Sequence, residues 1–150
     1  METQSSFIHL LLILLITLQF SCHQTKKDAD NILLKPWSEP FGGVPAFDQV
    51  KIEDVEQAML SAMALHLEQI QTIANNTATP TFENTIVEME RSGSKLERAT
   101  AYYGVLSRNE STPNFRVIQK KIAPHFADYH SKIIQNDKLF KRIAKIYENA

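Results

Sequence analysis

The feature that most constrains this fold is a helix break at Pro80 followed directly by a helix start. Thr81 has a side-chain oxygen that can accept a hydrogen bond from the backbone N–H groups of the next turn, which makes it a suitable N-cap. Glu83 then falls in the first turn, where the helix dipole favours negative charge. Apolar residues follow at the spacing of one helix face: Phe82, Ile86 and Met89. The pattern predicts that one helix ends before Pro80 and that a second begins at Phe82.

Before this break, helical periodicity runs from about Ile52 to Ala74. Acidic residues load the first turn, as the helix dipole prefers: Glu53, Asp54 and Glu56. Apolar positions repeat at intervals of three and four: Val55, Met59, Ala62, His66, Ile70 and Ile73. Residues 75–80 are polar or helix-breaking, and they end the helix. We therefore expect a long first helix whose apolar stripe includes one histidine.

The second helix is expected to continue from Phe82 to about Leu106. Gly93, which lies between two serines, is its weak point, because a glycine in a helix interior costs about 1 kcal/mol relative to alanine. We expect a bend or a close helix contact at Gly93 in preference to a full break. Beyond it the apolar stripe continues with Leu96, Ala99, Tyr103 and Leu106.

Two further helices follow. Thr112 and Pro113 form a helix start, with threonine as the N-cap and proline at the first helical position. Pro124 falls inside this third helix and predicts a kink but no stop, because the apolar spacing continues past it. Asn136 can cap a last helix. The expected buried side of that helix is Leu139, Phe140, Ile143, Ile146 and Tyr147.

Residues 28–48 hold too many prolines and glycines for a helix or a central strand. They also hold large apolar side chains, which a flexible tether would not need. We interpret the segment as an extended arm packed along the helices, with Trp37 and Phe41 as its anchors. The whole chain has four glycines, which argues against a turn-rich all-β architecture. The predicted fold class is therefore all-α, with an extended N-terminal arm followed by about four helices.

The N-terminus has the pattern of an export signal. Residues 7–20 are apolar and carry no Lys, Arg, Asp or Glu. Their length is that of a signal-peptide core and is short for a membrane span. Ser21 and Cys22 follow, and the chain then turns polar. A small residue before a cysteine at this point resembles a bacterial lipobox, in which the thiol is joined to diacylglycerol.

We therefore predict a lipoprotein signal peptide over residues 1–21, lipidation at Cys22 and a tether over residues 22–30. This would place the protein in the periplasm or at the outer membrane, held to the membrane by its lipid. The alternatives are an uncleaved membrane anchor, or a secretory signal in which Cys22 is incidental.

The net charge of −1 gives no reason to expect nucleic acid as a partner. Without residues 1–21 the chain holds 16 basic and 16 acidic residues. The charge is unevenly spread, since residues 51–90 carry a net −6 and residues 113–150 a net +5. We interpret this as mutual attraction between two halves that pack antiparallel. A basic surface for peptide carboxylates is the alternative.

No catalytic constellation is present in the sequence, and we assign no catalytic residue and no metal ligand. The chain has no His-Glu-x-x-His motif, no Gly-rich phosphate loop and no nucleophile elbow. A histidine on an apolar stripe, as at His66, is usually a satisfied core residue. His125 and His130 are five positions apart, so a straight helix would point them in different directions. The acidic residues at positions 83, 88 and 90 are most simply a solvated helix face.

Several short segments nevertheless resemble segments of the N-terminal region of one enzyme family, and they occur in the same order along the chain. These segments are residues 31–34, 43–50, 80–86, 90–93 and 122–124. The sequence Pro-Thr-Phe-Glu-Asn-Thr-Ile at residues 80–86 is the most distinctive of them. Together they resemble the thimet-oligopeptidase family of zinc metallopeptidases, which includes peptidyl-dipeptidases and oligopeptidase A. The resemblance covers about residues 31–150, although Ile52, Asp54 and Gln57 depart from the family's usual helix start.

The resemblance implies a zinc peptidase that cleaves short peptides. In the family, zinc is held by the His-Glu-x-x-His motif and a later glutamate, and that motif lies far beyond the region matched here. The matched region is helical and walls one side of a deep channel. We therefore expect residues 31–150 to be the N-terminal helical part of a larger α-helical peptidase, with the catalytic domain absent and the remainder of the enzyme as its partner. This part by itself is predicted to hydrolyse nothing and to bind no cofactor.

The alternative is a complete small helical lipoprotein that acts as a binding or scaffolding module. The coding sequence beyond Ala150 distinguishes the two hypotheses. An open frame that reaches His-Glu-x-x-His supports the peptidase, and a stop codon supports the module.

Overall fold

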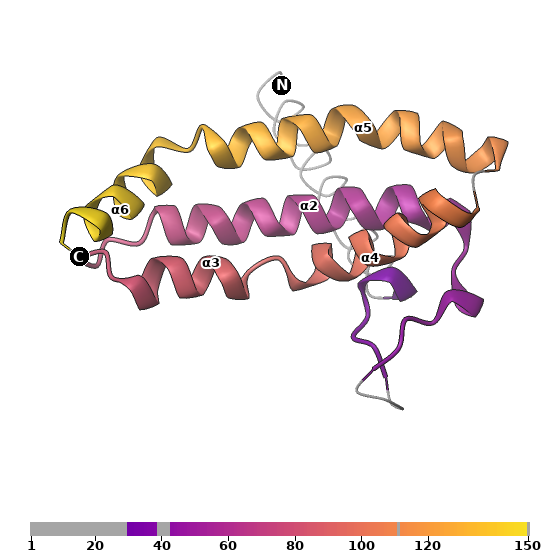
Figure 1. Cartoon of the computed structure of the whole chain (residues 1–150), viewed down its shortest axis with the longest axis horizontal. Coiled ribbons are helices and arrows are strands. Elements are labelled where there is room, and N and C mark those ends of the chain that lie inside the picture. Colours follow the sequence, from indigo (N-terminus) through magenta and orange to yellow (C-terminus); the bar gives the residue numbers. More distant parts are fainter. Residues whose placement is uncertain (1–29, 39–42, 111, 150) are drawn as a thin grey trace, which may run out of the picture.

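A computed structural model describes residues 30–38, 43–110 and 112–149. Within these ranges the chain forms helices and no β-strand, apart from an isolated antiparallel bridge between Ser38 and Val44. Figure 1 shows α5 and the α3–α4 segment on either side of α2, with α6 turning from the end of α5 across the end of α2. The prediction of an all-α fold with an N-terminal arm is confirmed.

Helix α2 (Ile52–Ala74) is the central element and has the predicted bounds. Its acidic first turn and its apolar stripe follow directly from the sequence pattern. The predicted stripe is buried at every position but one, since His66 is half-buried. The other members of the stripe lie in the core: Val55, Met59, Ala62, Ile70 and Ile73. Helix α2 therefore supplies the surface on which the other helices pack.

The second helix is divided into three pieces. It begins with η3 (Phe82–Val87), a π-helical turn, continues as α3 (Glu88–Arg91) and resumes as α4 (Ser94–Asn109). Thr81 is the N-cap, as predicted, and its side chain accepts from the Asn84 N–H at 3.1 Å. The predicted stripe is wrong at Phe82, which is 56% exposed. A π-helical turn is wider than an α-helical one, so it changes which residues face inward, and Thr85 is buried instead.

Gly93 marks a full break between α3 and α4, where a bend without a break was expected. Its φ of 76° lies in the left-handed region that glycine adopts without strain. The close helix contact predicted here is present, because a Cβ at Gly93 would lie 3.0 Å from the His66 ring. The break therefore gives α2 and the α3–α4 turn their close approach.

Helices α5 (Pro113–Ile134) and α6 (Asp137–Glu148) begin at the predicted caps. The Thr112 side chain accepts from the backbone N–H three residues on, and so does that of Asn136. Helix α5 continues past Pro124, so the proline does not stop it.

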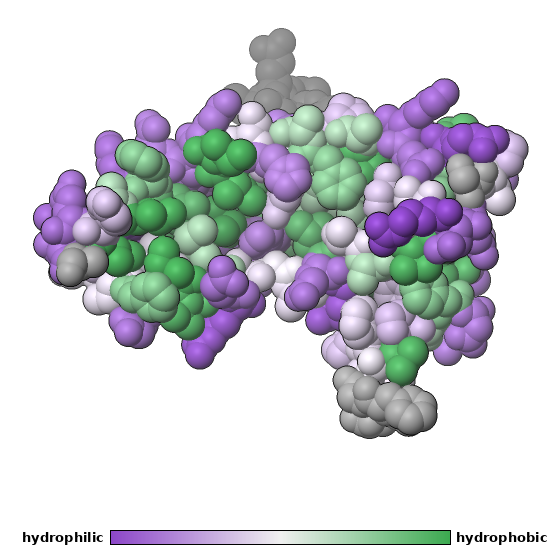
Figure 2. Space-filling model, in the orientation of Figure 1, coloured by the Kyte–Doolittle hydropathy of each residue, from purple (hydrophilic) through white to green (hydrophobic). Residues whose placement is uncertain are grey.

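The predicted buried face of α6 is wrong at two positions. Leu139 is buried, but Phe140 and Tyr147 are exposed at 68% and 85%. Arg142 is buried in their place, with 5% of its surface exposed. Figure 2 shows apolar surface over the end of the molecule formed by α6, η3 and α3.

The arm packs along the helices, as predicted, and its buried contacts are made by two leucines. Leu33 and Leu34 of η1 (Ile32–Leu34) are buried, and the Leu34 carbonyl accepts from Arg98 at 3.2 Å. Trp37 remains partly exposed and meets the Tyr102 ring edge-on at 6.4 Å. Phe41, the second expected anchor, lies outside the described residues. The two leucines are therefore buried anchors of the arm, and Trp37 adds a half-exposed contact.

A second short helix, η2 (Phe47–Gln49), follows in the arm. The Phe47 ring lies 5.1 Å from the Tyr102 ring, and the Ala46 N–H donates to the Tyr102 hydroxyl at 2.8 Å. Tyr102, on α4, thus joins both halves of the arm to the helices.

The core has two parts. The larger part lies where η1, α2, α4 and α5 meet, with Met59, Tyr102 and Phe115 among its fully buried side chains. The smaller part packs Leu139 of α6 against the last turns of α2. None of the described helices combines the length and the apolar character that a membrane crossing requires.

Candidate functional site

Cys22, the residue to which the sequence assigns a modification, lies outside the described residues. The signal peptide over residues 1–21 and nearly all of the tether lie outside them as well. Lipidation at Cys22 therefore stays a prediction.

In the described part of the chain, no three His, Cys, Asp or Glu side chains form a group that could hold a metal ion. His125 and His130 are both exposed on α5. The His130 ring stacks on Phe126, with centroids 6.3 Å apart. These residues do not fit the zinc ion that the family resemblance implies, and no chemical step at zinc follows from them.

One polar cluster lies at the contact between α2, α5 and the α3–α4 turn, and it is centred on His66. Its Nδ1 lies 2.5 Å from the Tyr129 hydroxyl, and its Nε2 lies 2.9 Å from the Ser92 hydroxyl. The Gly93 N–H of the same turn donates to Gln69 Oε1 at 2.8 Å. We call these residues the His66 cluster: His66, Gln69, Ser92, Gly93 and Tyr129.

The hydrogen bonds of Ser92 show where the His66 proton resides. The Ser92 hydroxyl donates to the Met89 carbonyl at 2.6 Å, and a carbonyl can only accept. Ser92 has no second proton for His66, so Nε2 carries the hydrogen and donates to Ser92. Neutral His66 is then left with Nδ1 as an acceptor for the Tyr129 hydroxyl. Burial lowers the pKa of His66 from its ordinary value of 6.5, which favours this neutral form.

This arrangement has the residue types of a serine–histidine pair but not the arrangement that catalysis needs. A general base must accept the proton of the nucleophile, whereas His66 donates to Ser92. The Ser92 proton is held by a backbone carbonyl. The His66 cluster therefore joins three segments of the fold, and it is not a nucleophilic centre.

The second polar cluster surrounds Arg142. All five of its N–H groups donate to oxygen. Nε and Nη2 donate to the Thr85 hydroxyl at 3.2 and 3.1 Å, and Nη2 also donates to Asn84 Oδ1 at 2.7 Å. Nη1 donates to the carbonyls of Asn76 and Ala78 at 2.5 and 3.1 Å. A buried guanidinium is tolerated here because every donor is satisfied.

Asn84 connects this cluster to the helix cap. Its Oδ1 accepts from the Thr81 N–H at 2.9 Å and from the Thr85 hydroxyl at 3.0 Å, in addition to Arg142. Its Nδ2 donates to the Thr79 carbonyl at 2.9 Å. The cap of η3, the loop before it and α6 therefore share one side chain.

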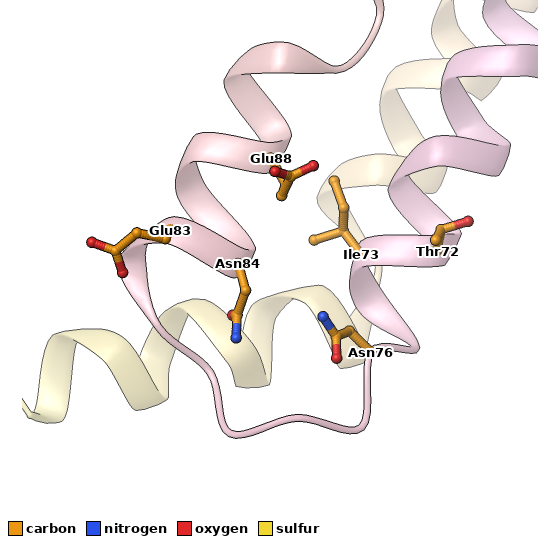
Figure 3. A pocket seen from close by; sticks show the side chains of 6 residues that line it. All are labelled: Thr72, Ile73, Asn76, Glu83, Asn84 and Glu88. Atoms are coloured by element: carbon orange, nitrogen blue, oxygen red, sulfur yellow. The ribbon is translucent and has the colours of Figure 1, made fainter.

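A pocket of about 380 Å³ lies beside the Arg142 cluster, between the end of α2 and the η3–α3 segment. Its lining is Thr72, Ile73, Asn76, Glu83, Asn84 and Glu88. Figure 3 shows the Asn76 and Asn84 side chains facing each other, while the carboxylate of Glu83 points away at the rim. Glu88 pairs with exposed Arg91 at 3.7 Å. The lining offers polar contacts but no convergent set of ligands.

The predicted attraction between the two halves has one direct counterpart among the described residues. Lys121 of α5 donates to Glu56 of α2 at 2.9 Å. The other ion pairs in this part of the chain join residues within one helix. An exposed pair of this kind contributes at most about 1 kcal/mol, so the packing of α2 against α5 is mainly apolar.

No protein-family model matches the chain. It is similar to dipeptidyl carboxypeptidases. It is 26% identical over 104 residues to "Dipeptidyl carboxypeptidase" of Escherichia coli K12 and 24% identical over 104 residues to the enzyme of the same name from Salmonella typhimurium LT2. Each match covers 69% of this chain and 15% of the relative. The chain thus spans a small part of the length of the curated relatives that it matches, and the similarity relates it to peptidases.

The sequence patterns assigned no role to Arg142, Asn84 or Ser92. A signal for Arg142 was present, because it lies three positions from Leu139 and four from Ile146 and so falls on the apolar stripe of α6. A charged residue on such a stripe is either paired or well hydrogen-bonded. Asn84 had a weaker signal, since it stands three positions after the N-cap, where a side chain can return to the cap.

Proposed function

We propose that residues 31–150 form the N-terminal helical part of a zinc metallopeptidase that removes dipeptides from the C-termini of short peptides. The observation that supports this is the similarity over 104 residues to two dipeptidyl carboxypeptidases. In this proposal the helices wall one side of a channel that admits short, unfolded peptides. The zinc ligands and the catalytic base belong to another part of the protein, because the described residues do not fit zinc.

The test is to express the complete reading frame and to measure the release of C-terminal dipeptides from short synthetic peptides. We expect activity that a chelator removes and that added zinc restores. The 150-residue chain alone, with zinc added, is expected to release none. A reading frame that ends after Ala150 would contradict the proposal, and so would peptidase activity in the isolated chain.

We also propose that the protein is exported and is anchored through a lipid on Cys22. The apolar segment at residues 7–20 and the following Ser21-Cys22 pair support this. Mass spectrometry of the mature N-terminus tests it. We expect a diacylglyceryl group on Cys22, and a free thiol there would contradict the lipid anchor.

A binding or scaffolding module is a second candidate function, supported by the exposed apolar side chains near α6. Ile134, Phe140 and Tyr147 are all largely exposed, and a protein complete in itself seldom leaves such a group in water without a partner. In this alternative the chain is whole and binds another protein through α6. A stop codon directly after Ala150 would favour the module over the peptidase.

A further inference from the structure

We propose that His66 is an acid-sensitive link that holds α2 to α5 at neutral pH and weakens this contact in acid. The ring bridges segments that are far apart in the chain. Tyr129 is 63 positions away and Ser92 is 26. His66 therefore links α2 to α5 through Tyr129 and, together with Gln69, links α2 to the α3–α4 turn.

The contact with Tyr129 requires neutral His66, whereas the contact with Ser92 is kept when the ring gains a proton. Nε2–H donates to Ser92, since the Ser92 proton goes to the Met89 carbonyl. Nδ1 is then a bare acceptor that faces the Tyr129 hydroxyl. The Tyr129 side chain is 6% exposed and has no other hydrogen-bond partner among the described residues. Protonation of Nδ1 would place the Nδ1–H of His66 opposite the O–H of Tyr129. The Tyr129 hydroxyl would then have to rotate its hydrogen to a position where no acceptor is available.

The ring has little room to move when it gains a proton. Gly93 packs against it so closely that a Cβ at that position would lie 3.0 Å from the ring. The Tyr129 ring is also close, with its centroid 5.8 Å from that of His66. A protonated ring that stays in this place opposes the Tyr129 hydroxyl, and a weaker contact between α2 and α5 removes that opposition.

The groups that surround His66 offer no negative charge to stabilise a protonated ring. From α5 the facing titratable group is Tyr129, with His130 behind it at 5.1 Å between ring centroids. From the α3–α4 turn the facing group is the Ser92 hydroxyl, and the nearby Arg91 pairs outward with Glu88. From α2 itself, neutral Gln69 binds the turn. No carboxylate among the described residues forms an ion pair with the His66 ring.

The direction of the pH effect follows from linkage. Burial lowers the pKa of His66 in the folded protein below the 6.5 of the unfolded chain, so the unfolded or opened form binds more protons. Stability is then full above about pH 6.5 and falls as the pH drops toward the folded-state pKa. A single proton can change the opening equilibrium by at most about tenfold per pH unit.

The experiment uses amide hydrogen exchange on the full mature chain at about pH 7.5 and pH 5.5, corrected for the intrinsic exchange rate. We expect protection around Tyr129 to fall by up to about tenfold per pH unit, and protection at residues 92–94 and around Leu139 to change less. The variant His66→Gln keeps a neutral donor and acceptor and should remove the pH dependence. The matched control His130→Gln removes an exposed histidine next to Tyr129 and should keep it.

The pKa and the tautomer of His66 can also be measured in the wild-type protein, so this test does not depend on whether the variant folds. NMR titration of the wild-type His66 ring should report a pKa below 6.5 and the Nε2–H tautomer at neutral pH. A pKa at or above 6.5, or a predominant Nδ1–H tautomer, would overturn the proposal. So would a folded His66→Gln variant that keeps the full acid response.

Discussion

The guanidinium of Arg142 on α6 donates to the side-chain oxygen of Asn84 at 2.7 Å, across 58 positions of sequence. Asn84 is the residue that returns to the cap at Thr81, so the start of η3 and the last described helix are set by one contact. The loop before the cap binds the same guanidinium through the carbonyls of Asn76 and Ala78. The end of the molecule opposite the arm is therefore built around a single buried charge.

Replacing Arg142 with lysine should destabilise the protein by about 3 kcal/mol, because an ammonium group cannot make the five hydrogen bonds that the guanidinium group donates. Chemical denaturation followed by circular dichroism measures the change. Lys141→Gln is the matched control, since Lys141 is exposed on the same helix, and it should alter the free energy of unfolding by less than about 0.5 kcal/mol. Equal stability of the Arg142→Lys variant and the wild type would show that the cluster is dispensable.

Gly93→Ala should destabilise the fold by about 1–3 kcal/mol for two reasons. The backbone has a φ of 76°, and the new methyl group would lie 3.0 Å from the His66 ring. Gly104→Ala provides the contrast, because its new Cβ would meet only the flexible tip of Arg108 at 3.3 Å within α4. There the substitution should be neutral or should stabilise by up to about 1 kcal/mol. The midpoint of thermal unfolding should therefore fall for Gly93→Ala, and it should rise or change little for Gly104→Ala.

Tyr102→Phe should loosen the arm while leaving the helices folded. The variant loses the hydroxyl that accepts from the Ala46 N–H at 2.8 Å, a contribution of about 1 kcal/mol. Limited proteolysis should cut residues 43–51 faster in the variant than in the wild type. Tyr147→Phe is the control, since Tyr147 is 85% exposed and should leave the cleavage rate unchanged. If both variants resist protease equally, the arm does not depend on this hydrogen bond.

The double change of Phe140→Ser and Tyr147→Ser should reduce self-association of the isolated chain without lowering its stability. Both side chains are largely exposed, so little buried apolar area is lost. Phe115→Ser is the opposite case, because Phe115 is fully buried and its replacement should cost about 3–5 kcal/mol. Sedimentation velocity measures the association, and denaturation measures the stability. A stability loss in the double variant comparable to that of Phe115→Ser would mean that α6 is packed differently.

Much of the fold could be predicted from the sequence because its signals are local. Thr81, Thr112 and Asn136 cap helices where their side chains can reach the next turn, and α2 has the bounds that its periodicity indicates. The break at Gly93 was underestimated. Helix propensity reflects only the cost of a glycine in a helix interior, whereas the close approach of His66 to Gly93 depends on tertiary packing.

The two polar clusters could not be derived in the same way. Each joins residues more than 20 positions apart, and no spacing rule connects Arg142 with Asn84 or His66 with Tyr129. Phe140 and Tyr147 were predicted to be buried because apolar residues on a short helix were counted as one face. The buried face of α6 instead includes Arg142, because the loop carbonyls and Asn84 offer enough acceptors to satisfy a charge there.

The loop at residues 75–80 has the composition of a place where an engineer would insert a tag or open new chain termini. Its carbonyls, however, are the acceptors of a buried guanidinium. An insertion next to Ala78 would leave N–H donors of Arg142 buried without acceptors. It would therefore destabilise the packing of α6, which is more than 60 positions away in the sequence. A fluorophore or an affinity tag is better placed on the exposed face of α5, for example at Lys120, where no such contact depends on the backbone.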